Sequence, residues 1–138
     1  RRGTDYWVHL NSGKKLSIDV KIRETDFAFK DPPQDDLALE IWSVVGKKIG
    51  WTRDPDKQTD FILWHWKDSG RICMQPFPIL CSVFTLNMVA WMASYSEKIQ
   101  TQTTVNEDET SYESQCIFIP RCVVLQAMID RFGGRMAA

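Results

Sequence analysis

The feature that most constrains the fold is a pair of short runs near the start of the chain. In residues 16–22, apolar side chains alternate strictly with Ser17, Asp19 and Lys21. This alternation predicts a β-strand, because successive side chains of a strand point to opposite faces. Residues 5–10 form a similar run, and the segment between the two is rich in turn-forming residues. We therefore predict an antiparallel hairpin that brings Asp5, at the start of the first strand, towards Asp19 and Lys21.

The overall composition limits the possible architectures and partners. The chain has 138 residues, of which 43% are hydrophobic, so it can form one domain with a real core. We predict a single domain over residues 1–138. The formal net charge is −1, so the protein has no global basic field. If DNA is the partner, a local basic patch must attract it.

Two further observations bear on the cellular location. No apolar stretch runs uninterrupted for about eighteen residues, and no basic start precedes an apolar run and a cleavage site. We expect a cytoplasmic protein that does not bind a membrane. The four cysteines form no close C-x-x-C pair, which favours buried free thiols over a zinc site. They are Cys73, Cys81, Cys116 and Cys122.

The rest of the chain predicts an α/β domain with a mixed sheet. The expected order is a loop (24–36), a strand covered on both faces (37–45), a basic loop (46–58), two strands (59–66 and 71–77), a helix (79–95), a long mobile excursion (96–114), a short strand (115–119), and a helix that begins at Pro120 and stops at Gly133-Gly134.

Two segments outside the hairpin carry candidate functional residues. Glu40 is a charged residue in an otherwise apolar strand. It either pairs with a lysine or takes a proton, or it reaches the hairpin site, and we favour the last interpretation. The basic loop offers cations for DNA phosphates and an indole for base stacking. Alternatively, it is a solvated loop whose tryptophan covers the core. Its candidate residues are Lys47, Lys48, Trp51, Arg53 and Lys57.

The hairpin residues fit metal-dependent phosphoryl chemistry. Mg²⁺ prefers oxygen ligands and is commonly held by one or two carboxylates together with substrate phosphate. Asp5 and Asp19 match this donor set, and Lys21 can orient a water molecule or neutralise charge on the phosphoryl group. No nucleophile elbow, P-loop or dinucleotide-binding motif is present.

These motifs resemble those of a known superfamily. Gly3-Thr4-Asp5, followed on the next predicted strand by Ile18-Asp19-Val20-Lys21, looks like the signature of PD-(D/E)XK nucleases, although the proline is absent here. Residues 38–43, residues 50–52 and Lys57-x-Thr59-Asp60 also look like phage or mobile-element proteins of this type. The resemblance covers roughly the first third of the chain at motif level.

The resemblance implies a restriction-endonuclease-like fold, with a central mixed sheet flanked by helices. It further implies that Asp5, Asp19 and the Val20 carbonyl bind Mg²⁺ or Mn²⁺ and that Lys21 is the catalytic lysine. Many members also carry an acidic residue on a helix before the first strand. That helix would precede residue 1 here, and Glu40 is the candidate to replace its acidic residue.

The predicted function is therefore a metal-dependent deoxyribonuclease of phage or mobile-element type, which hydrolyses phosphodiester bonds with a metal-activated water. The resemblance also implies a homodimer, for which the apolar helix 79–95 offers a surface. One alternative is a catalytically inactive protein of nuclease fold that binds nucleic acid or acts as a phage accessory interaction protein. Another is a globular domain in which Asp19 and Lys21 form an exposed salt bridge.

Overall fold

The computed structural model describes residues 4–136, so Gly3, the first residue of the nuclease-like motif, lies outside the described residues. The chain forms two compact units, and each is built from two separate segments. The first unit comprises residues 1–35 and 55–80, and the second comprises residues 36–54 and 81–138. The prediction of a single domain stays a prediction.

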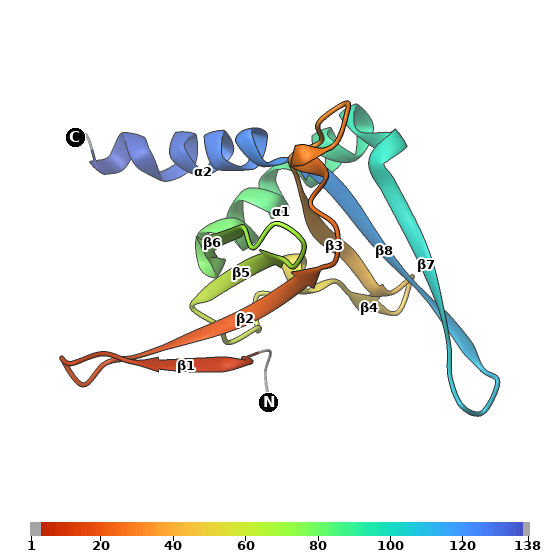
Figure 1. Ribbon diagram of the computed structural model, residues 1–138, viewed down its shortest axis with the longest axis horizontal. Coiled ribbons are helices and arrows are strands. Elements are labelled where there is room, and N and C mark those ends of the chain that lie inside the picture. Colours follow the sequence, from red (N-terminus) through yellow and green to blue (C-terminus); the bar gives the residue numbers. More distant parts are fainter. Residues whose placement is uncertain (1–3, 137–138) are drawn as a thin grey trace. The chain divides into compact units, whose positions relative to one another are not determined.

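The first unit contains a four-stranded mixed sheet (Figure 1). Its strands lie in the order β1-β2-β5-β6. The β1–β2 and β5–β6 pairs are antiparallel, whereas β2 and β5 are parallel. The predicted hairpin is thus confirmed. The strands are β1 (Tyr6–His9), β2 (Lys15–Arg23), β5 (Phe61–Trp66) and β6 (Ile72–Pro76).

The polar face of β2 is the buried face of this sheet. Asp19 is aligned with Ile62 of β5, and both side chains are buried, with 4% and 0% of their surface exposed. Ile22 belongs to the apolar face of β2 and is 56% exposed. Trp64, next along β5 on the same face as Asp19, is fully buried. The aspartate therefore lies beside a hydrophobic core and not on a solvated strand face.

The second unit contains an antiparallel four-stranded sheet in the order β4-β3-β8-β7. Leu37, Leu39 and Ile41 alternate along β3 and are buried, while the residues between them are only half-buried. One face of this strand is therefore fully buried and the other is partly covered, where cover on both faces was expected. The strands are β3 (Asp36–Val44), β4 (Lys48–Ile49), β7 (Ile99–Val105) and β8 (Ser111–Pro120).

The largest difference from the predicted elements concerns residues 96–114. These form the short 3₁₀-helix η3 (Ser96–Lys98), the strand β7 and the start of β8, where a mobile excursion was expected. A continuous register from Ile99↔Ile117 to Val105↔Ser111 joins the two strands. The segment is polar because most side chains of β7 are exposed, and its threonines favour extended backbone. Because few of its residues are apolar, the sequence pattern did not predict β7 as a strand.

Two α-helices complete the second unit, and the first of them begins at the end of the first unit. Helix α1 spans Phe77–Ser94, close to the predicted 79–95. By length and composition it could cross a membrane, with a mean hydropathy of 1.5 and 28% of the segment buried. A mostly buried core helix of a soluble protein can have the same length and composition, so this observation alone does not place the chain in a membrane. Helix α2 spans Arg121–Met136, so the predicted stop at Gly133-Gly134 was wrong, because glycine weakens a helix without necessarily ending it.

The predicted mixed α/β class is confirmed. The expected single central sheet is corrected to two four-stranded sheets, because β3 pairs with β4 and β8 and not with the strands of the hairpin. The remaining short elements are the 3₁₀-helices η1 (Phe27–Phe29) and η2 (Trp51–Arg53).

Candidate functional site

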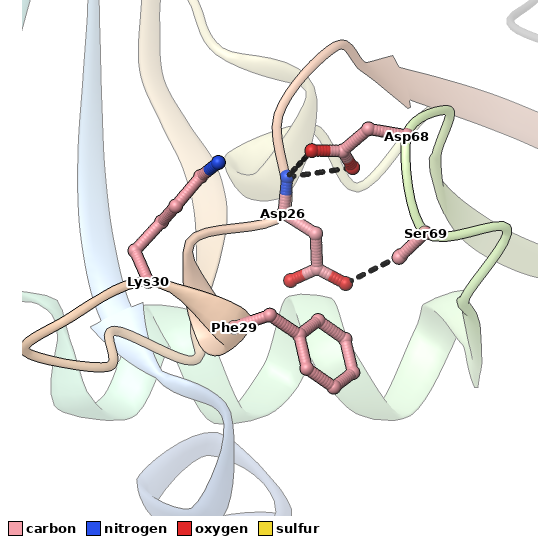
Figure 2. Close-up of a pocket in the computed structure, with 5 residues that line it drawn as sticks. All are labelled: Asp26, Phe29, Lys30, Asp68 and Ser69. Atoms are coloured by element: carbon pink, nitrogen blue, oxygen red, sulfur yellow. Dashed lines mark hydrogen bonds between the residues drawn. The ribbon is translucent and has the colours of Figure 1, made fainter.

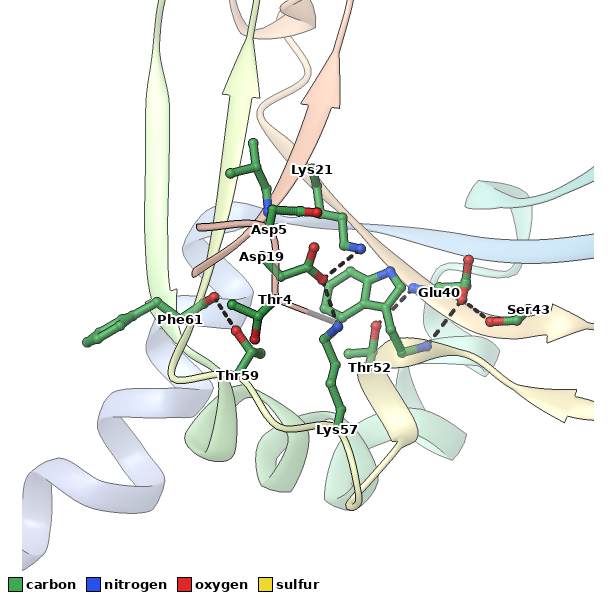
Figure 3. Close-up of polar contacts among 12 residues, drawn as sticks. Thr4, Asp5, Asp19, Lys21, Glu40, Ser43, Thr52, Lys57, Thr59 and Phe61 are labelled. Carbon is green, nitrogen blue, oxygen red and sulfur yellow. Dashed lines mark hydrogen bonds and ion pairs between the residues drawn. The ribbon is translucent and has the colours of Figure 1, made fainter. Parts of the chain in front are cut away.

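Asp5 lies where the β1–β2 ladder ends (Figure 3). Its amide donates to the carbonyl of Ile18 at 2.9 Å, and its Oδ2 accepts a hydrogen bond from the amide of Val20 at 2.9 Å. A side chain therefore continues the pairing beyond the last backbone bonds. The N–H and C=O groups of one strand residue point to the same edge of the strand. The Val20 carbonyl thus shares the edge of β2 that the Asp5 carboxylate approaches.

Asp19 is the buried centre of this group. Its Oδ2 lies 2.9 Å from Nζ of Lys21 and 2.8 Å from Nζ of Lys57. These are ion pairs without aligned hydrogen bonds, since Oδ2 is buried and has no hydrogen-bond partner. The Asp19–Lys21 salt bridge of the alternative interpretation is therefore present, but Asp19 is only 4% exposed, so the pair is not an exposed surface pair.

Lys57 is the residue whose position the sequence did not reveal. It was predicted to bind DNA from a basic loop, yet its side chain is only 7% exposed and its ammonium group contacts Asp19. The segment that follows it is tied to β2, because the Asp60 carboxylate accepts hydrogen bonds from the Ser17 amide and hydroxyl. The Gln58 carbonyl accepts another from the Thr4 hydroxyl. The motif Lys57-x-Thr59-Asp60, just before a strand, was the sequence signal that could have indicated that Lys57 lies beside β2.

The donor set of the hairpin fits a hard divalent cation. Asp5 and Asp19 supply carboxylate oxygens, and the Val20 carbonyl supplies a neutral one, which are the ligand types that Mg²⁺ prefers. Two ammonium groups already contact the buried Oδ2 of Asp19, so a metal ion would compete with Lys21 and Lys57 for this oxygen. Among residues 4–136, no group of three or more His, Cys, Asp or Glu side chains is placed to hold a metal. Water and substrate oxygens would have to complete the coordination.

Glu40 belongs to the second unit and has partners there. Its Oε1 accepts hydrogen bonds from the Trp51 amide and the Ser43 hydroxyl, and its own amide donates to Oγ1 of Thr52 at 2.9 Å. These contacts fasten η2 to β3. These contacts do not test whether Glu40 pairs with a lysine or acts beside Asp19, so both interpretations stay predictions.

The other basic-loop residues also lie in the second unit. Lys47 and Lys48 are exposed, as a phosphate-binding role requires. Arg53 instead donates from Nη1 to the Ile41 carbonyl at 3.0 Å and stacks over Trp42, with 4.8 Å between the guanidinium carbon and the ring centroid. Its guanidinium is thus partly committed to packing. The four cysteines are free thiols, but none is fully buried, and Cys122 is exposed.

A second polar cluster in the first unit was not predicted. Asp26 is 1% exposed and accepts hydrogen bonds from Nε and Nη2 of Arg71, both at 2.8 Å, and from the Ser69 hydroxyl at 2.7 Å. The hydrogen bonds from Arg71 lower the pKa of Asp26 from 3.8 to about 2, despite its burial. Asp26 in turn raises the pKa of Arg71. The pair joins the end of the hairpin to the β5–β6 turn.

An open pocket of about 330 Å³ lies at this junction (Figure 2). Its polar groups are engaged with one another, since the Asp68 carboxylate accepts from the Asp26 amide at 2.9 Å and the Ser69 hydroxyl donates to Asp26. Phe29 and Lys30 form its remaining walls. We interpret the pocket as a structural junction, because its carboxylates already have partners.

Comparison with protein-family models, with curated proteins and with solved structures gives no match. The functional interpretation therefore rests on the residues and geometry of the hairpin site.

Proposed function

We propose that this protein is a Mg²⁺- or Mn²⁺-dependent deoxyribonuclease with a restriction-endonuclease-like fold, from the PD-(D/E)XK superfamily. The observation that supports the proposal is the convergence at one strand end of two carboxylates, a strand carbonyl and a lysine. These are Asp5, whose carboxylate accepts a hydrogen bond from the Val20 amide, the Val20 carbonyl, and Asp19, which pairs with Lys21. We further propose that the protein is cytoplasmic, encoded by a phage or mobile element, and acts on DNA as a homodimer.

The chemistry follows from the roles of these groups. Bound Mg²⁺ would polarise the phosphodiester and lower the pKa of a coordinated water. The Asp5 and Asp19 carboxylates would bind the cation. Asp19 is fixed on β2, and Asp5 is held against that strand by the hydrogen bond from the Val20 amide. Lys21 lies on the same face two residues beyond Asp19, so its ammonium can orient the attacking water or neutralise charge that develops on the phosphoryl oxygens.

Cleavage assays on variants test this function. Linear, branched and single-stranded DNA would be incubated with the parent, Asp19→Asn and Lys21→Ala in Mg²⁺, Mn²⁺ or EDTA. We expect cleavage by the parent only with metal, and a loss of at least about 100-fold in each variant, as for removal of a group that stabilises the transition state. Glu107→Gln is the matched control, because it removes an exposed carboxylate from the second unit. Full activity of Asp19→Asn would refute the proposal.

A catalytically inactive protein of nuclease fold is the second candidate, as a nucleic-acid-binding or phage accessory interaction protein. One observation favours it: Asp5 and Asp19 are balanced by Lys21 and Lys57, so the four groups carry no net charge to attract a divalent cation. DNA binding that survives EDTA, with no cleavage under any metal condition, would support this candidate. Loss of that binding in the double variant of Lys47 and Lys48 to Ala would locate the DNA contact.

A further inference from the structure

A buried lysine contacts the carboxylate to which the proposed function assigns the metal. Nζ of Lys57 is 2.8 Å from Oδ2 of Asp19, and the two side chains are 7% and 6% exposed. We infer that Lys57 is an internal counter-cation, which neutralises Asp19 in the metal-free protein and is displaced when a divalent cation binds. The inference rests on the proposed metal site and adds a competing residue to it.

Burial distinguishes Lys57 from the second lysine at this carboxylate. The Lys21 side chain is 29% exposed and is already partly hydrated. The Lys57 side chain is nearly enclosed, and its ammonium lies 6.0 Å from the centroid of the Phe77 ring. A buried ammonium is costly unless it is paired. Asp19 is an acidic partner that offsets this cost, which favours the Lys57–Asp19 contact until another cation binds Asp19.

Displacement follows from the geometry of the shared oxygen. Two ammonium groups already contact the same Oδ2, at 2.8 and 2.9 Å. A divalent cation bound to that carboxylate would face two positive charges at short range, and repulsion in a partly buried site is strong. Lys57 is more buried than Lys21, so less water screens its repulsion from a bound divalent cation. Its free energy therefore falls most when its ammonium group moves away and becomes hydrated or binds an anion.

The surrounding segment allows this exchange without unfolding. The hydrogen bonds from the Ser17 amide and hydroxyl to the Asp60 carboxylate, and from the Thr4 hydroxyl to the Gln58 carbonyl, hold the backbone next to Lys57. The four-carbon side chain can reorient on this fixed backbone. The released ammonium would remain beside the site and can bind a phosphodiester oxygen of the substrate. Lys57 would therefore contact phosphate only when the metal is bound.

Calorimetric titration with Mn²⁺ tests the competition directly. We expect Lys57→Met to bind Mn²⁺ about tenfold more tightly than the parent, a change of about 1.4 kcal/mol, because the competing cation is gone. Lys57→Arg keeps the charge and should bind like the parent. Lys14→Met is the matched control, since it removes an exposed lysine from the hairpin turn. Equal or weaker Mn²⁺ binding by a folded Lys57→Met would overturn the inference.

A measurement on the parent covers the case in which Lys57→Met fails to fold. Lysine acetylation of the parent would be followed by mass spectrometry, without metal and with Mn²⁺ at about 20-fold molar excess over the protein. We expect Lys57 to be protected without metal and to become several-fold more reactive with it, while Lys14 is unchanged. Equal protection in both conditions would overturn the inference. Neither readout depends on cleavage, so metal-enhanced reactivity of Lys57 without DNA hydrolysis would refute only the nuclease proposal.

Discussion

The buried Asp26–Arg71 pair leads to a quantitative prediction about stability. Asp26→Asn preserves the shape of the side chain and removes its charge, so Arg71 loses a carboxylate that it contacts at 2.8 Å through two nitrogens. Because Asp26 is 1% exposed, solvent cannot replace the interaction. The change should therefore destabilise the protein without disturbing the residues at Asp19.

The magnitude follows from the pKa of Asp26, which is lowered from 3.8 to about 2. A shift of this size corresponds to roughly 2 kcal/mol of folding free energy at neutral pH. The folded-state pKa lies below the unfolded value. The contribution is therefore fully present above pH 3.8 and is lost as the pH falls through about 2. We expect it to be about half as large near pH 3.

Urea denaturation of the parent and Asp26→Asn at several pH values measures this contribution. The difference in unfolding free energy should be about 2 kcal/mol at pH 7 and about 1 kcal/mol at pH 3, with a melting temperature lower by about 5–10 °C at pH 7. Glu24→Gln is the control, because Glu24 pairs with Lys67 on the surface, where the two side chains are 77% and 53% exposed. It should cost less than about 1 kcal/mol. A difference for Asp26→Asn that stays constant from pH 7 to pH 3 would refute the reasoning.

Two further predictions concern packing and hydrogen bonding. Gly50→Ala should destabilise the protein by at least about 3 kcal/mol, because the added Cβ would lie 2.1 Å from the Glu40 carbonyl oxygen; a melting temperature equal to that of the parent would contradict this. Ser17→Ala should cost about 1–2 kcal/mol, because its hydroxyl both donates to the Asp60 carboxylate and accepts from the Asp60 amide. Chemical denaturation checks this value, and an unchanged urea midpoint would argue against a stabilising role for these bonds.

Local patterns predicted the elements whose signal is periodic. The strict alternation in residues 16–22 gave β2, and the turn residues before it gave the antiparallel hairpin. The helical spacing after residue 79 gave α1. The strand β7 was missed because it is largely exposed and therefore lacks the apolar alternation that reveals a half-buried strand. Its threonines were the remaining indication.

Contacts between distant segments determined the rest. The parallel pairing of β2 with β5 aligns residues more than 40 positions apart, and no local pattern encodes that register. This pairing brings the segment before β5 alongside Asp19. Because the sequence alone does not reveal the pairing, Lys57 was predicted to lie in a DNA-binding loop. Asp26 and Arg71 meet for the same reason, at a separation of 45 residues. A charged residue in a loop gives no sign by itself of a partner so far along the chain.

The sequence by itself determined that Asp19 and Lys21 share one face of a strand and that Asp5 lies at the start of the segment that pairs with it, because a period of two and a short turn fix these relations locally. Only the tertiary structure decided that this face is buried, that Lys57 is the second cation at Asp19, and that two separate sheets replace one. Burial and partner choice depend on which distant strands pair, and that is settled by the free energy of the whole fold.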